Sequence, residues 1–89
     1  MASQRGPYGL AQVHGPTFAR RLREVRHHFG LTQSKLAERL STSQAQVSRF
    51  ENAINNPTRR SIIRLAFALG VTMETLLAPP GGAITLTEE

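Results

Sequence analysis

Residues 32–57 constrain the fold most, because they predict two short helices separated by a tight turn. Thr32 is a suitable N-cap for the first helix, whose apolar residues then recur at helical spacing. A polar turn follows, and Ser43 is the N-cap candidate of a second helix that starts at Gln44. We expect the rest of the chain to hold these two helices in place.

The second of these helices has two contrasting faces. Its predicted buried stripe consists of Val47, Phe50 and Ile54. The opposite stripe consists of Gln44, Ala45, Ser48, Arg49 and Asn52, with Gln46 on the flank. A helix that only faced solvent would carry Glu and Lys there, whereas amide, hydroxyl and guanidinium groups pair with base edges in the DNA major groove. We therefore expect Gln44, Ala45, Ser48 and Arg49 to read bases, the alternative being ordinary solvated side chains.

The segment LTQSKLAERLSTSQAQVSRFEN, followed by NP, resembles the helix-turn-helix domain of the lambda-repressor/Cro-like (XRE-type) family. The resemblance runs from about Phe18 to Leu77 and includes the closing residues LA, LGV and LL. It implies an all-α fold and binding to double-stranded DNA. It also implies an ion pair between Arg26, in a helix expected at 17–29, and Glu51, at the end of the helix that starts at Gln44, which is the recognition helix of this family. The alternative is two unrelated exposed charges.

Ser41 and Ala53 depart from the family pattern, which usually has Gly at both positions. Gly is favoured there because the backbone often takes a positive φ. A residue with a Cβ would lose roughly 1 kcal/mol in that conformation. We therefore expect the helix ends to shift slightly instead.

The remaining segments complete a compact five-helix bundle with a flexible N-terminal arm and a short C-terminal tail. Further helices are expected at 17–29, 59–69 and 73–77, with Thr17, Thr58 and Thr72 as N-caps. This gives an arm at 1–16, a DNA-binding domain at 17–78 and a tail at 79–89. Within the tail, residues 83–87 alternate apolar and polar, which is a weak strand signal.

Several other polar residues are expected to contact DNA phosphates. Gln33 lies at a helix N-terminus, where free backbone N–H groups can hold a phosphate; simple capping is the alternative. Arginine is unfavourable at the positive end of a helix, and a nearby phosphate would explain why Arg59 and Arg60 are there. The full expected set is Gln33, Ser43, Gln46, Asn52, Asn55, Arg59 and Arg60.

Composition agrees with one small domain that binds a polyanion. The 89 residues carry a net charge of +5, and a small basic domain favours a polyanionic partner. The absence of cysteine excludes disulfides and thiolate metal sites, which suits a reducing cytosol, so the expected location is cytoplasmic. No apolar run is long enough to span a bilayer, and no membrane partner is expected.

Catalysis finds no support in the sequence. His14, His27 and His28 include no i, i+4 pair and lack Cys or Asp neighbours at metal-ligand spacing. No glycine-rich phosphate loop leads into a helix. We expect no enzymatic activity, no metal and no cofactor.

Two functional classes therefore remain. The first is a stand-alone transcriptional repressor that binds a palindromic operator as a homodimer. The second, by resemblance to HipB- or HigA-like antitoxins, is a DNA-binding antitoxin that binds a toxin protein and autorepresses its operon. A fragment of a larger regulator is a third possibility. The dimer contact is expected from Met73, Leu76, Leu77, Ile84 and Leu86, the last two in a strand that pairs with its two-fold mate.

Overall fold

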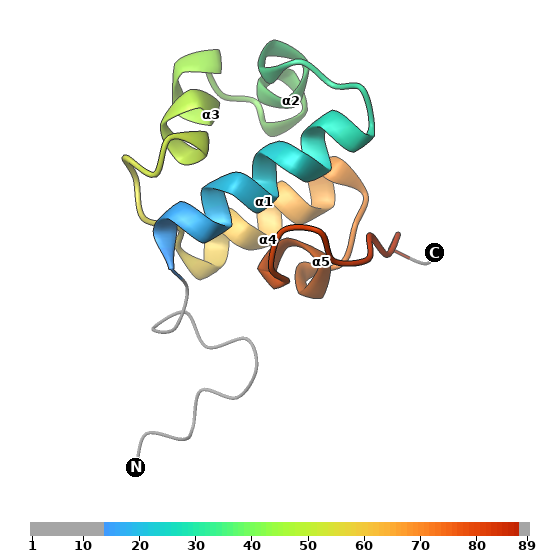
Figure 1. Ribbon diagram of the computed structural model, residues 1–89. Helices are drawn as coiled ribbons and strands as arrows, with labels where there is room; N and C mark the ends of the chain where they lie inside the picture. Colours follow the sequence, from blue (N-terminus) through green and yellow to red (C-terminus); the bar gives the residue numbers. More distant parts are fainter. Residues whose placement is uncertain (1–13, 88–89) are drawn as a thin grey trace.

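The computed structural model describes residues 14–87, and these form five helices without a regular sheet (Figure 1). The helices are α1 (Gly15–His28), α2 (Gln33–Leu40), α3 (Gln44–Glu51), α4 (Arg59–Leu69) and α5 (Met73–Leu77). The all-α, five-helix prediction is confirmed. Of the predicted arm, residues 1–13 lie outside the described part of the chain.

Helix α1 begins earlier than predicted, at Gly15 rather than Thr17. His14 is the N-cap, and its Nδ1 accepts a hydrogen bond from the Thr17 backbone N–H at 3.3 Å. Pro16 fits the first turn because the N–H that it lacks would have no partner inside the helix. The other predicted N-caps, Thr32, Ser43, Thr58 and Thr72, are confirmed.

All five helices contribute to the core: α1 packs against α3 and α5, and α4 packs against α2 and α5. In Figure 1, α2 and α3 lie on one side of α1 and α5 on the other. The buried apolar residues of the core are Phe18, Leu22, Val25, Leu36, Ala37, Leu40, Val47, Ile62, Leu65, Ala66, Leu69, Val71 and Leu76. Helix α3 contributes only Val47 to this set. Its other side chains are therefore left for the surface or for polar contacts.

The predicted buried stripe of α3 is only partly correct. Val47 is fully buried and Phe50 packs partly against the core, but 68% of Ile54 is exposed. The helix ends at Glu51, and the chain reverses at Ala53 before it reaches Ile54. Helical spacing therefore no longer determines which way Ile54 faces.

The expected shift of the helix ends is wrong, because Ser41 and Ala53 both take the left-handed conformation, with φ of 56° and 59°. Beyond Ser41 the Thr42 N–H donates to the Ala37 carbonyl at 3.0 Å, and an equivalent bond follows Ala53 at 2.9 Å. These bonds satisfy helix-end carbonyls that would otherwise lack a partner. They offset a strain of about 1 kcal/mol at each residue.

The C-terminal tail pairs with its own chain. An isolated antiparallel bridge joins Val71 to Leu86. On either side of it, the Thr72 N–H donates to the Thr85 carbonyl at 3.1 Å and the Thr87 N–H donates to the Gly70 carbonyl at 3.0 Å. The strand signal at 83–87 therefore corresponds to a single bridge within one molecule.

Arg21 anchors this tail, a role that the sequence did not reveal. Its side chain is fully buried, and its guanidinium donates to the carbonyls of Thr75 at 2.8 Å, Gly82 at 3.1 Å and Ala83 at 2.7 Å. Glu24 completes the anchor by accepting from the Gly81 N–H at 2.9 Å. From sequence alone Arg21 is one of several arginines on a basic helix.

No helix within residues 14–87 has the length and apolar character needed to cross a lipid bilayer.

Candidate nucleic-acid interface

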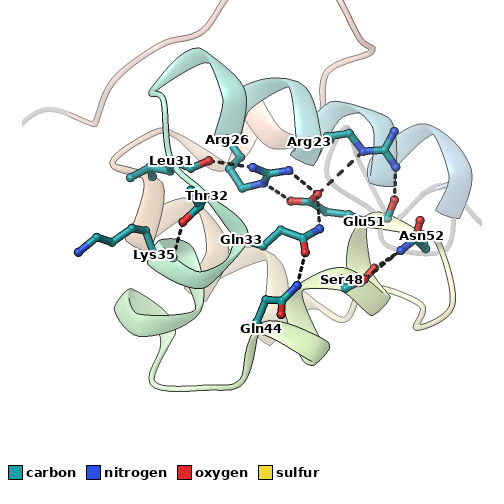
Figure 2. Close-up of polar contacts among 10 residues, drawn as sticks. All are labelled: Arg23, Arg26, Leu31, Thr32, Gln33, Lys35, Gln44, Ser48, Glu51 and Asn52. Carbon is teal, nitrogen blue, oxygen red and sulfur yellow. Dashed lines mark hydrogen bonds and ion pairs between the residues drawn. The ribbon is translucent and has the colours of Figure 1, made fainter.

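The predicted reading face lies on the outer side of α3. Gln44, Ala45 and Arg49 are exposed, and Ser48 is half-buried. Asn52 donates from its side-chain nitrogen to the Ser48 carbonyl at 2.8 Å and to the Ser48 hydroxyl at 3.1 Å (Figure 2). The Asn52 side chain is thus held against α3 by Ser48, while the polar groups of Gln44 and Arg49 face solvent and can contact a ligand.

A chain of amide hydrogen bonds connects this face to the interior (Figure 2). The Gln44 Nε2 donates to the Gln33 Oε1 at 2.8 Å, and the Gln33 Nε2 donates to the Glu51 Oε1 at 3.0 Å. The N-cap of α2 is Thr32, so Gln33 is not the capping residue. Its side chain instead joins the start of α2 to both ends of α3, at Gln44 and Glu51.

Glu51 and Arg26 form a buried ion pair at the centre of this arrangement (Figure 2). The Arg26 Nε donates to the Glu51 Oε2 at 2.6 Å, and the Arg26 Nη2 donates to the Glu51 Oε1 at 2.9 Å. The exposed fractions of the two side chains are 9% and 1%. The alternative of two unrelated exposed charges is therefore wrong. Such a two-point contact fixes direction as well as distance.

Two further contacts extend the ion pair to neighbouring backbone. The Arg26 Nη1 donates to the Leu31 carbonyl at 2.8 Å, which ties in the segment between α1 and α2. The Arg23 Nη2 donates to the Glu51 carbonyl at 2.6 Å, at the last residue of α3. Arg23 was not predicted, and its spacing of three residues from Arg26 on α1 is the only sequence signal for it. Together these contacts fix α3 against α1 and α2.

The residues expected to bind phosphate are not all brought together. Ser43 caps α3, and its hydroxyl accepts from the Gln46 N–H at 3.2 Å. It directly precedes Gln44, which is bonded to Gln33. Arg59 and Arg60 lie at the start of α4, beyond the loop that contains half-buried Asn55. Neither arginine side chain has a hydrogen bond or ion pair to another of residues 14–87.

Within the described residues, no three His, Cys, Asp or Glu side chains gather in an arrangement that could hold a metal ion. His27 and His28 are exposed on α1, and the His28 ring packs edge-on against Phe29 with ring centroids 4.9 Å apart.

The family described as a helix-turn-helix domain matches residues 17–79, which include all five helices except the first two residues of α1. The chain belongs to this helix-turn-helix family. Its members are DNA-binding transcription regulators, and the predicted function class is confirmed at that level.

Curated relatives and a solved structure agree with the family. Antitoxin HipB of Escherichia coli K12 is 33% identical over 63 residues, covering 70% of this chain and 72% of that protein. The uncharacterized HTH-type transcriptional regulator y4dJ of Sinorhizobium fredii is 40% identical over 70 residues, covering 79% and 86%. The restriction-modification controller protein C.AhdI of Aeromonas hydrophila superposes with a TM-score of 0.65 at 33% identity, covering 68% of this chain and 92% of that one.

Proposed function

We propose that the protein is a sequence-specific transcriptional repressor that binds a palindromic operator as a homodimer. The observation that carries this proposal is the buried polar cluster that holds α3 in a fixed orientation. Glu51 is fixed by Arg26, and Gln33 links Glu51 to Gln44 on the exposed face. Bases are read only when the reading groups are held in register, so the buried cluster suits specific binding. The proposal also places the protein in the cytoplasm and gives it no catalytic role.

Arg49 and Gln44 have the most definite roles in this proposal. An arginine pairs best with guanine through N7 and O6, and a glutamine pairs best with adenine. The bond from Gln44 to Gln33 leaves the Gln44 carbonyl oxygen and its second N–H available for a base. The proposed phosphate contacts, which position the protein without reading sequence, are Gln33, Ser43, Gln46, Asn52, Asn55, Arg59 and Arg60. Of these, Asn52 would first have to release its two hydrogen bonds to Ser48.

A pair of matched arginine variants tests these roles. Arg49→Ala is expected to cost about 1–3 kcal/mol on the operator and to relax base preference at one position. Arg60→Ala is expected to weaken binding to operator and non-operator DNA alike. It should also reduce, by about 1, the steepness with which the logarithm of the binding constant falls with the logarithm of the salt concentration. Titrations of both duplexes at several salt concentrations measure this. Equal loss on both duplexes for Arg49→Ala would mean that Arg49 contacts phosphate and that the reading face is rotated.

The dimer part of the proposal rests on the surface of α5 and the tail. Met73, Leu77 and Ile84 are half-buried, and 58% of Leu86 is exposed. Leu76 is fully buried inside the chain, so its predicted place in the dimer contact is wrong. The backbone N–H and C=O of Leu86 have no partner among residues 14–87. They therefore form a short edge to which a second tail can add.

A two-fold dimer would place two recognition helices about 34 Å apart, matching half-sites one helical turn apart. Sedimentation equilibrium of the wild type and Leu86→Lys tests the contact, with Thr87→Lys as a control that adds the same charge next to it. Leu86→Lys should dissociate the dimer and shorten the DNA footprint to one half-site. A wild-type monomer that protects an isolated half-site would contradict the dimer.

The alternative function, a DNA-binding antitoxin, is favoured by a specific surface. Ile63 and Phe67 lie one turn apart on α4 with exposed fractions of 45% and 86%. Two exposed apolar side chains on one helix face provide a contact for a protein partner. The matching relative named antitoxin HipB supports this reading.

Co-expression with the product of the adjacent gene separates the two functions. If that gene encodes a toxin, the two proteins should co-elute in gel filtration, and Phe67→Lys should abolish co-elution without changing operator affinity. If the adjacent gene product neither inhibits growth nor co-elutes with this protein, the antitoxin function is rejected and the repressor function is retained.

A further inference from the structure

A half-open cavity of about 200 Å³ lies behind the helix-turn-helix, between the turn that joins α2 to α3 and the helix α4. Its apolar lining comes from Leu40, Phe50 and Leu65, and its polar lining from Thr42, Gln46, Ser61 and Arg64. Gln46 and Phe50 are one turn apart on α3, on the side of the helix opposite Gln44. An occupant would therefore contact this side of the recognition helix and leave Gln44 free, while Gln46 is shared with the proposed phosphate contacts.

The polar groups at this cavity have spare hydrogen-bonding capacity. Neither the Thr42 hydroxyl nor the Gln46 side-chain amide has a hydrogen-bond partner among the described residues 14–87. Arg64 uses its Nη2 to bond the Leu40 carbonyl at the end of α2, and the rest of its guanidinium has no such partner in that part of the chain. No carboxylate lines the cavity. The local charge is thus positive, which favours an anion.

The size of the cavity limits the ligand. A cavity of about 150 Å³ lined by apolar side chains accommodates benzene in a well-studied engineered protein. The present cavity is slightly larger and adds a polar side. It therefore has room for one six-membered ring or a short branched chain with one carboxylate, and not for a nucleotide.

We propose that this cavity binds a small aromatic or branched monocarboxylate. The carboxylate pairs with Arg64 and accepts hydrogen bonds from Thr42 and Gln46. The apolar body lies against Leu40 and Phe50. Because these residues come from α2, the turn, α3 and α4, such a ligand ties the recognition helix to the rest of the bundle. The site is independent of whether the protein acts as a repressor or an antitoxin.

Benzoate is a suitable probe, with benzamide as its neutral counterpart of the same shape. Benzoate should shift the backbone amide resonances of Thr42, Gln46 and Ser61 saturably, with a dissociation constant of about 1 mM or lower. It should also raise the melting temperature, because a ligand that binds only the folded state stabilises it. Benzamide should bind about fivefold more weakly, which is the effect of one partly exposed ion pair.

The isosteric variant Gln46→Glu tests the location by bringing a negative charge to the cavity. It should lower the affinity for benzoate about fivefold and leave the affinity for benzamide nearly unchanged. Asn56→Asp is the matched control, since it adds the same charge at an exposed residue that does not line the cavity, and it should bind benzoate like the wild type. Non-saturable shifts, shifts centred elsewhere, or equal losses for both variants would overturn the proposal.

Discussion

Glu51→Ala is the substitution that most directly tests how the recognition helix is held. It removes a carboxylate that accepts three hydrogen bonds, two from Arg26 and one from Gln33. Arg26 remains in place with only its Nη1 bonded, to the Leu31 carbonyl. Its side chain is only 9% exposed, so water cannot readily replace the lost carboxylate.

The expected cost follows from this burial. Leaving one partner of a buried ion pair uncompensated costs about 3–5 kcal/mol. A small domain has a total stability of only about 5 kcal/mol or slightly more. In a domain of this size, each 1 kcal/mol lowers the melting temperature by about 4–8 °C. The variant is therefore expected to melt at least about 12 °C below the wild type and to be partly unfolded near room temperature, with DNA binding lost as a consequence.

Thermal melts followed by circular dichroism measure this, with Glu38→Ala as the matched control. Glu38 is 73% exposed and pairs with Lys35 at 3.6 Å on the surface of α2, so its loss should cost less than about 1 kcal/mol. The double variant Arg26→Met/Glu51→Leu should recover much of the lost stability, because it removes both buried charges together. It should not recover full DNA affinity, because Gln33 still lacks its partner and Gln44 is less firmly held.

A Glu51→Ala melt within about 4 °C of the wild type, a shift worth no more than about 1 kcal/mol, would refute the reasoning. It would mean that the Arg26 guanidinium finds water or another acceptor when the carboxylate is absent. Apolar packing around Val47 would then be enough to orient α3.

Two further predictions concern stability. Ser41→Gly and Ala53→Gly should each raise the melting temperature by a few degrees in the same assay, because glycine removes about 1 kcal/mol of left-handed strain; a lower melting temperature for both would contradict the strain. The Gly81 N–H and Arg21 hold the pKa of the Glu24 carboxyl below its ordinary value, so the folded state binds this proton more weakly than the unfolded state. The stabilisation is therefore present above the ordinary glutamate pKa and is lost as the pH falls through the lower folded pKa. Hydrogen exchange at Gly81 should accelerate in acid for the wild type, relative to intrinsic rates, and lose this dependence in Glu24→Gln.

Local sequence determined the helices, the turn and the face of α3 that meets solvent. Four of the five predicted N-caps are correct, because a Ser or Thr hydroxyl before a helix acts on an N–H only three residues away. The cap of α1 was missed because His14 is an uncommon N-cap and Thr17 matched the usual pattern. Contacts of this range leave their signal in the spacing of neighbouring residues.

Only the tertiary structure decided which charged and apolar side chains are inside. Arg21 and Arg23 look alike in sequence, yet Arg21 is buried against carbonyls of α5 and the tail, more than 50 residues away, and Arg23 reaches the end of α3. Ile54 and Phe67 are large apolar residues of the kind found in cores, yet they are exposed. Leu76, expected at a dimer surface, is fully buried. Whether a side chain is buried depends on which segments, distant in sequence, pack against it. The spacing of neighbouring residues carries no information about that packing.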